Sequence, residues 1–198
     1  MFADALTRRL AGIVELSAEQ VAALEGHYET LLRWNRSLNL TSISGLEEAV
    51  ERHYCESLFL GAHLPAGSLR IADIGSGAGF PGFPVAVLRP DFSVTLIESH
   101  QRKAVFLREA TRELPNVRVF AKRAETVVEQ FDWAISRAVS YKDLAPILKV
   151  VAANADLLTG AEEPLERMGF QWGSAVALPW GGYRFLRTGR RQREGNSR

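Results

Sequence analysis

Cysteine is almost absent from this chain of 198 residues, in which Cys55 is the only one. A single cysteine excludes an intrachain disulfide framework and a thiolate metal cluster. The histidines are scattered along the chain without the spacing of metal ligands, so the sequence predicts no metal site. They are His27, His53, His63 and His100.

Long apolar runs are also lacking. Near the N-terminus, Arg8 and Arg9 are followed by a segment in which Glu15 and Glu19 interrupt the apolar residues. This pattern is typical neither of a signal peptide nor of a membrane span. We therefore expect a cytoplasmic protein that does not associate with membranes. Separately, we expect the protein to be a monomer.

Overall charge of one sign is missing as well, because 24 Lys and Arg residues nearly balance 23 Asp and Glu residues. The end of the chain differs: from Arg184 onward it carries several arginines, and Glu194 is the only acid. A basic tail of this kind has two interpretations, an arm that binds nucleic acid or a solvated end. In the first, Arg187, Arg190 and Arg191 contact RNA.

The remaining composition is that of a globular protein, with 46% hydrophobic residues. Residues 1–62 carry helical patterns, including the capping-box sequence Ser17-Ala18-Glu19-Gln20, and are predicted to form a helical cap. Residues 63–198 are predicted to form the main α/β domain and its basic tail, packed with the cap as one compact unit.

From Ser68 the pattern alternates between strand and helix, which predicts a mostly parallel sheet covered on both faces. The last two strand-like runs are joined by Pro179-Trp180-Gly181-Gly182, which predicts an antiparallel hairpin and seven strands in all. The expected strands are 69–74, 93–98, 117–121, 131–135, 155–158, 172–178 and 183–187, and the expected helices between the parallel strands are 81–88, 101–114 and 143–151.

The most informative segment is the glycine-rich run from Asp73 to Gly82, which lies between two apolar runs. A buried strand, a glycine turn and a helix in this order bring backbone amides and a helix N-terminus close to a nucleotide-like ligand. Glu98 ends the next strand, where a carboxylate can accept hydrogen bonds from ribose hydroxyls.

Two cofactors compete for this turn. The residues 77–82 fit G-x-G-x-x-G, the fingerprint of a nicotinamide dinucleotide site, but a second mononucleotide-binding half is lacking. The alternative is S-adenosylmethionine, since Asp73 followed by Gly75, Gly77 and Gly79 resembles the first motif of class I methyltransferases. An antiparallel strand after five parallel ones favours the methyltransferase, and a cofactor titration separates the two hypotheses.

Several motifs in sequence order resemble one family over about residues 30–160, the bacterial small-subunit ribosomal RNA guanine-N7 methyltransferases called RsmG or GidB. The motifs are Trp34-Asn35 with Asn39-Leu40-Thr41, Arg52-His53, the Asp73–Gly82 turn, Glu98-Ser99 with Arg102-Lys103 and Phe106-Leu107, Arg123-Ala124-Glu125, and Ser136-Arg137-Ala138.

The resemblance implies a Rossmann-like class I methyltransferase fold, S-adenosylmethionine as the methyl donor, and N7 of a guanosine in 16S ribosomal RNA, free or in the small subunit, as the acceptor. It also implies residue roles. Gly75 and Phe80 lie against the cofactor, Ala124 and Glu125 flank its adenine, and Arg137 lies in the active cleft. There the guanidinium is expected to hold a phosphate, the methionine carboxylate or guanine O6.

Two positions depart from the family pattern. Glu56-Ser57 stands where many members have Asp-Ser, and Thr159-Gly160 stands where they have Lys-Gly. Arg52 and His53 have two interpretations, contact with RNA or anchoring of the cap.

The rival hypotheses are an NAD(P)-dependent reductase, a non-catalytic RNA- or ribosome-binding module on a methyltransferase fold, and a methyltransferase acting on a small molecule or protein.

Overall fold

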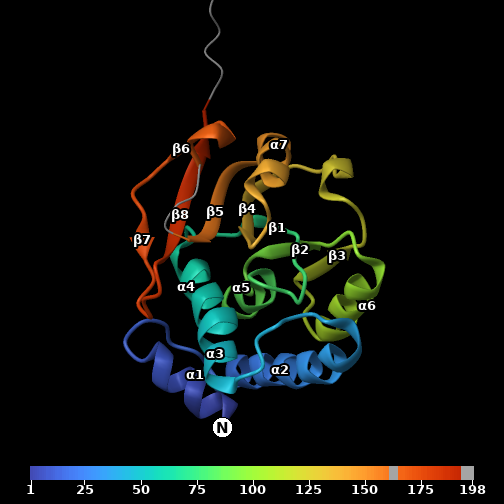
Figure 1. The fold of residues 1–198 in the computed structure, drawn as a ribbon, viewed down its shortest axis with the longest axis vertical. Coiled ribbons are helices and arrows are strands. Elements are labelled where there is room, and N and C mark those ends of the chain that lie inside the picture. Colours follow the sequence, from blue (N-terminus) through green and yellow to red (C-terminus); the bar gives the residue numbers. More distant parts are fainter. Residues whose placement is uncertain (161–164, 193–198) are drawn as a thin grey trace, which may run out of the picture.

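The computed structural model describes residues 1–160 and 165–192, which form a twisted sheet with helices on both faces (Figure 1). The strand order is β3-β2-β1-β4-β5-β8-β6, and β7 pairs with β8 outside this path. The strands are β1 (Arg70–Ile74), β2 (Ser93–Ile97), β3 (Val117–Phe120), β4 (Phe131–Arg137), β5 (Ala152–Gly160), β6 (Phe170–Trp172), β7 (Val176–Ala177) and β8 (Arg184–Arg191).

This sheet confirms the predicted α/β class with one correction. Strands β1 to β5 pair in parallel, whereas β8 pairs antiparallel with β5, β6 and β7. The predicted hairpin corresponds to β7 and β8. The expected seven strands are eight, because the run predicted as one strand, 172–178, is divided between the end of β6 and β7. Gly173, Ser174 and Ala175 separate these two short strands.

The helices fall into a cap and a set that covers the sheet. Figure 1 shows α1 and α2 below the sheet and α7 on its other side. The helical elements are α1 (Phe2–Leu10), α2 (Ala18–Leu38), α3 (Leu46–Ala49), the π-helical turn η1 (Val50–Cys55), α4 (Glu56–His63), α5 (Gly82–Leu88), α6 (Gln101–Ala110), α7 (Tyr141–Val151), and the 3-10 turns η2 (Ala124–Thr126) and η3 (Leu165–Met168). No helix of the described ranges is long and apolar enough to cross a membrane.

Local sequence explains where the long cap helix starts and stops. The Ser17 hydroxyl accepts a hydrogen bond from the Gln20 amide, and the Gln20 side chain accepts one from the Ser17 amide, so the predicted capping box is formed. Asn39 ends α2 in the left-handed conformation, which asparagine tolerates better than most residues. The cap then returns through α3, η1 and α4 as one continuous helical segment.

Alternating residues of the strands face two apolar cores. On one side, Ile71 and Ile135 pack with α4, α5, α6 and the cap helices, including Leu24 and Leu31 of α2. On the other side, Ala72 and Ala134 pack with α7 and η3. Because successive strand residues point to opposite faces, β1 and β4 each contribute to both cores. The cap therefore shares its core with the sheet.

The expected last strand, 183–187, is present and continues to Arg191, so Arg190 and Arg191 belong to the sheet and not to a tail. Contact of these arginines with RNA stays a prediction. Arg184, Arg187, Arg190 and Arg191 lie in β8, between β5 and β6. The remaining arginines of the expected tail, Arg193 and Arg198, lie outside the described residues. This segment pairs with β5 at seven positions. Its backbone N–H and C=O groups therefore find hydrogen-bond partners in the sheet, whatever the charge of its side chains.

Candidate active site

The glycine turn follows β1 at the carboxyl edge of the parallel strands. Gly75, Gly77 and Gly79 have positive φ angles of 71°, 56° and 89°, a conformation that residues with a Cβ rarely adopt. The amides of Gly75 and Ser76 donate to the carbonyl of Ile97 at the end of β2. The turn is thus fixed against the neighbouring strand, and only glycines follow its path without strain.

Two carboxylates brace the turn from its two sides. Glu98 accepts a hydrogen bond from the Gly77 amide at 2.9 Å and another from the His100 amide at 2.7 Å. Asp73 accepts one from the Gly82 amide at 3.0 Å, at the start of α5. Burial raises the pKa of Asp73 to about 7, and its second oxygen is buried without a hydrogen-bond partner among the described residues.

A cap histidine supports the turn from below. His27 of α2 is buried, and its Nε2 lies 3.1 Å from the Ala78 carbonyl while its Nδ1 lies 2.8 Å from the Tyr54 hydroxyl. A carbonyl only accepts, so Nε2 carries the proton and Nδ1 accepts from Tyr54. Burial lowers the pKa of His27 to about 3, which keeps the ring neutral in this tautomer.

Arg137 joins the sheet to the cap from the end of β4. Its guanidinium donates to the Arg52 carbonyl and, at 2.9 Å, to Nδ1 of His53. Since Nδ1 accepts, His53 is protonated on Nε2, which donates to the Thr41 hydroxyl at 2.8 Å. Burial and the neighbouring Arg137 and Arg52 cations lower the pKa of His53 to about 3. Arg137 also lies over the Phe80 ring, 5.3 Å from its centroid.

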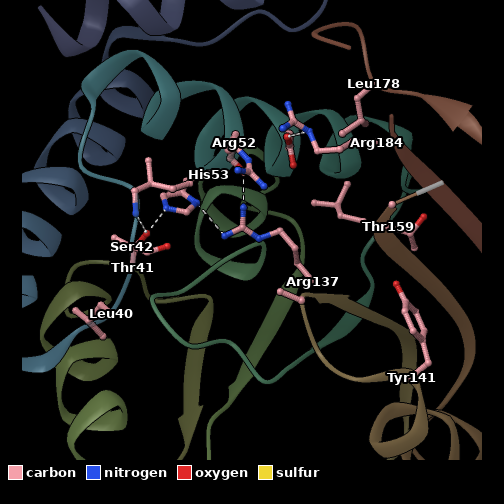
Figure 2. Close-up of a pocket in the computed structure, with 15 residues that line it drawn as sticks. Leu40, Thr41, Ser42, Arg52, His53, Arg137, Tyr141, Thr159, Leu178 and Arg184 are labelled. Atoms are coloured by element: carbon pink, nitrogen blue, oxygen red, sulfur yellow. Dashed lines mark hydrogen bonds and ion pairs between the residues drawn. The ribbon is translucent and has the colours of Figure 1, made fainter. Parts of the chain in front are cut away.

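A cavity of about 520 Å³ opens beside this junction, between the cap and the carboxyl edge of the sheet. Figure 2 shows Arg137 directed toward Arg52 and His53 on one side, with Thr159 and Tyr141 across the opening and Arg184 farther along. The lining comprises Leu40, Thr41, Ser42, Ile43, Arg52, His53, Glu56, Arg137, Ala138, Tyr141, Leu158, Thr159, Gly160, Leu178 and Arg184.

The strand order divides the carboxyl edge into two neighbouring regions. The glycine turn and Glu98 follow β1 and β2, whereas the cavity lies over the ends of β4, β5 and β8. Ligands of open α/β sheets bind in the crevice outside the carboxyl ends of the strands, where the strand order reverses. The two regions therefore suit two ligands that meet near Arg137.

The structure brings together most of the residues singled out from the sequence. Asp73, Gly75, Gly77 and Glu98 form one region, and Arg52, His53 and Arg137 line the cavity. Their roles toward ligands stay predictions. The anchoring interpretation of His53 has direct geometric support, because its ring connects Thr41 to Arg137.

The positions of three other residues give less support to their expected contact with the cofactor. They are Phe80, Ala124 and Glu125. Phe80 is buried, and its ring stacks on His53 with centroids 4.6 Å apart, so it supports the cap interface. Ala124 and Glu125 lie on η2, after β3. Their contact with a cofactor stays a prediction.

The C-terminal arginines are placed differently from the expectation. Arg190 pairs in register with Asn154 near the start of β5, whereas Arg184 pairs with Gly160 at its end. Arg190 and Arg191 are thus at the far edge of the sheet from the cavity, and Arg191 donates to the Lys149 carbonyl. Arg187 lies between the two ends.

Sequence reasoning missed two charged residues of the cavity. Glu56 and Arg184 form an ion pair there with Arg184 Nε 2.6 Å from Glu56 Oε1, and both side chains are largely buried. The two residues are 128 positions apart in the sequence, and no local motif connects them. The only available signal was the replacement of the family's Asp-Ser by Glu56-Ser57.

No group of three or more His, Cys, Asp or Glu side chains in the ranges 1–160 and 165–192 is arranged to hold a metal ion.

Comparison with protein families gives a match over residues 20–155 to GidB, described as rRNA small subunit methyltransferase G. A protein named ribosomal RNA small subunit methyltransferase G from Halorhodospira halophila is 41% identical over 145 residues, covering 73% of this chain and 68% of that protein. One of the same name from Chromobacterium violaceum is 43% identical over 131 residues, covering 64% and 62%. The chain thus aligns with about two thirds of the length of these relatives.

Two solved methyltransferase structures share this fold. A SAM-dependent methyltransferase from Aquifex aeolicus superimposes with a TM-score of 0.58 at 19% identity, over 72% of this chain and 92% of that one. TYW2 from M. jannaschii, solved in complex with AdoMet, gives a TM-score of 0.52 at 16% identity, over 70% and 76%. At these identities the likeness establishes the Rossmann-like class I methyltransferase fold.

The residues at the turn fit S-adenosylmethionine. A Cβ placed on Gly77 would meet no atom closer than 3.8 Å, so the space above the turn is open. Glu98 uses its two oxygens for backbone amides, yet a carboxylate has about four acceptor sites, so capacity remains for ribose hydroxyls. These residues would hold the nucleoside part of the cofactor.

We expect Gly77→Ala to weaken binding of S-adenosylmethionine at least about tenfold, because the methyl group would occupy the open space above the turn. The matched control is Gly12→Ala, since Gly12 also has a positive φ, 73°, with no atom within 4 Å of an added Cβ. Both variants should lose about 1–2 kcal/mol of folding stability from backbone strain. Calorimetric titration and thermal melts separate the two effects.

Equal cofactor affinity in the two alanine variants would contradict the site. Gly75 is a poorer test, because an added Cβ would lie 2.7 Å from Val139 Cγ2 and disturb the fold itself.

Proposed function

We propose, because the chain belongs to the GidB family of rRNA small subunit methyltransferases, that it transfers a methyl group from S-adenosylmethionine to N7 of a guanosine in 16S ribosomal RNA. The observation that carries the proposal is the carboxylate-braced glycine turn beside a cavity whose wall carries Arg52, Arg137 and Arg184. The first region suits a nucleoside cofactor and the second an anionic, base-bearing acceptor.

The chemistry asks little of acid or base groups. Bound S-adenosylmethionine supplies a methyl group activated by a positively charged sulfur. Guanine N7 has a free lone pair and no proton, so it attacks the methyl carbon in line with the leaving sulfur and no general base is needed. The positive charge passes from sulfur to the guanine ring. This suits a cavity lined by His53, whose pKa is lowered to about 3 by burial and by the Arg137 and Arg52 cations, so that its ring is neutral.

Catalysis then depends on alignment and on exclusion of water. Holding two reactants in line contributes up to roughly 7–11 kcal/mol when the geometry is good. The cap supplies this constraint, since His27 fixes the turn at Ala78 and Arg137 fixes the cap at Arg52 and His53. The two ligands would meet between rigid walls.

The acceptor base must leave any RNA helix. N7 lies on the major-groove edge, which is deep and narrow in A-form RNA, so the base comes from a loop or is turned out. The cavity of about 520 Å³ has the volume expected of a ligand pocket. Arg52, exposed at the cavity and paired with Glu48 at 3.2 Å, is placed to meet a phosphate of the same RNA.

The proposal includes the setting of the reaction. Its partner is 16S ribosomal RNA, free or in the small subunit, which places the protein in the cytoplasm. The proposal takes the protein to act as a monomer.

The direct test is transfer of labelled methyl groups from S-adenosylmethionine to small ribosomal subunits that lack the modification, followed by chemical cleavage at 7-methylguanosine. We expect one cleavage position in 16S RNA, which would identify the acceptor as N7 of a single guanosine. Transfer with no cleavage would assign the methyl group to another acceptor atom. No transfer, with cofactor binding intact, would favour a non-catalytic RNA-binding module.

Replacing Arg137 tests the junction. We expect Arg137→Ala to lower the rate of methyl transfer about 10- to 100-fold. The change removes the hydrogen bonds to the Arg52 carbonyl and to His53, so the cap side of the cavity is no longer held in position. Affinity for S-adenosylmethionine should change less than about threefold, because the turn is braced by other residues.

The control is Arg70→Ala, since Arg70 lies at the opposite end of the parallel strands and pairs with Asp132 on the surface. Single-turnover kinetics and a cofactor titration give the two quantities. Undiminished transfer by a folded Arg137→Ala variant would remove Arg137 from the mechanism.

A further inference from the structure

We propose that Glu56 recognises the acceptor base as guanine, by accepting hydrogen bonds from its N1–H and N2–H groups in the cavity. The proposal rests on the proposed function and names the residue that gives the acceptor region its base specificity.

Glu56 is a buried carboxylate on the wall of the cavity. It begins α4, is 3% exposed, and lies 2.6 Å from Arg184 Nε through its Oε1. Despite this closeness, neither Glu56 Oε1 nor Arg184 Nε has a hydrogen bond of good geometry within residues 1–160 and 165–192. A carboxylate has about four acceptor sites and Arg184 approaches Oε1, so Glu56 retains capacity for a ligand in the cavity that it lines.

The chemistry of a carboxylate selects one base. Guanine alone among the four RNA bases presents two adjacent donors, N1–H and N2–H, on its pairing edge. Adenine and cytosine each place an acceptor beside their amino group, and uracil places its one donor between two carbonyls. An ionised carboxylate accepts hydrogen bonds only, so it complements guanine and repels the other three.

The position of Glu56 agrees with the orientation that transfer to N7 requires. N7 must face the donor at β1 and β2, which turns the N1 and N2 edge toward the far side of the cavity. Glu56 is on that far side, because its partner Arg184 lies on β8, beyond β4 and β5. At about 4.8 Å per strand, β1 and β8 are roughly 14 Å apart, which accommodates a purine and its contacts.

The charges in the cavity serve the same purpose. Burial raises the pKa of Glu56 to about 7 even though the Arg184, Arg137 and Arg52 cations oppose this rise, so the ionised form predominates only above neutral pH. Methylation at N7 leaves a positive charge on the guanine ring. The ionised carboxylate at the opposite edge stabilises that charge as it develops.

The test removes one hydrogen-bond donor from the RNA and, separately, replaces one acceptor in the protein. Small subunits are reconstituted with 16S RNA carrying guanosine or inosine at the methylated nucleotide, since inosine lacks only the N2 amino group. We expect the unaltered protein to methylate guanosine about 10- to 100-fold faster than inosine, the range for losing a hydrogen bond to a charged group. For Glu56→Gln, the preference should fall below about threefold.

The control variant is Glu48→Gln, which removes an exposed carboxylate paired with Arg52 and should leave the preference unchanged. Thermal melts and cofactor affinity check that each variant is folded. If Glu56→Gln does not fold, Glu56→Ala is used, which removes both acceptor oxygens and should reduce the preference at least about threefold. Glu56→Asp, the residue that many family members carry here, keeps the carboxylate and should retain the preference.

A folded Glu56→Gln or Glu56→Ala variant with the full preference for guanosine would overturn the assignment, as would equal rates on guanosine and inosine by the unaltered protein. In both cases methyl transfer itself persists, so the proposed function stands. No transfer to either RNA by the unaltered protein would instead refute the proposed function, and this assignment with it.

Discussion

The glycine turn after β1 is the feature on which the rest of the site depends, and it is held by two carboxylates. Glu98 binds the Gly77 amide and Asp73 binds the Gly82 amide, so the backbone between them has one available path. A buried carboxylate is costly unless its hydrogen bonds are made, and Asp73 is fully buried. Burying Asp73 lowers the folding stability, but its hydrogen bond holds the turn in one conformation. Such local costs are common where a site must be rigid before its ligand binds.

The cap extends this constraint from the turn to the cavity. His27 reaches the turn at Ala78, Tyr54 donates to His27, and the next residue back along η1, His53, binds Arg137 of β4. The π-helical turn η1 thus presents adjacent residues both to the turn and to the cavity. Because the cap and the sheet share one apolar core, these polar contacts are held by packing on both sides.

The sequence was sufficient for features that depend on local pattern. The strand, glycine turn and helix around Gly75 follow from one continuous run, residues 69–88, and the capping box at Ser17 follows from four residues. The last strand was predicted to end at Arg187, four residues before its observed end at Arg191, because only Leu186 and Gly189 of β8 are buried and its alternation is weak. Its place in the sheet comes from backbone pairing with β5, which composition does not encode.

The cavity could not be predicted for a different reason. Thr41, Glu56, Thr159 and Arg184 come from four separate elements or loops, and only the packing of the cap onto the sheet brings them together. The resemblance to the family located Arg137 and His53 but gave no partner for either. The structure adds the hydrogen bonds that determine their tautomers and charges, which spacing in the sequence cannot provide.

The most direct measurement of the central claim is a titration of the purified chain with S-adenosylmethionine and, separately, with NADH. The glycine turn, Glu98 and the antiparallel β8 predict saturable binding of one S-adenosylmethionine per chain, displaced by S-adenosylhomocysteine and unaffected by NADH. Binding of NADH at the same site, or no binding of S-adenosylmethionine to the folded chain, would contradict the account of the turn and of the function built on it.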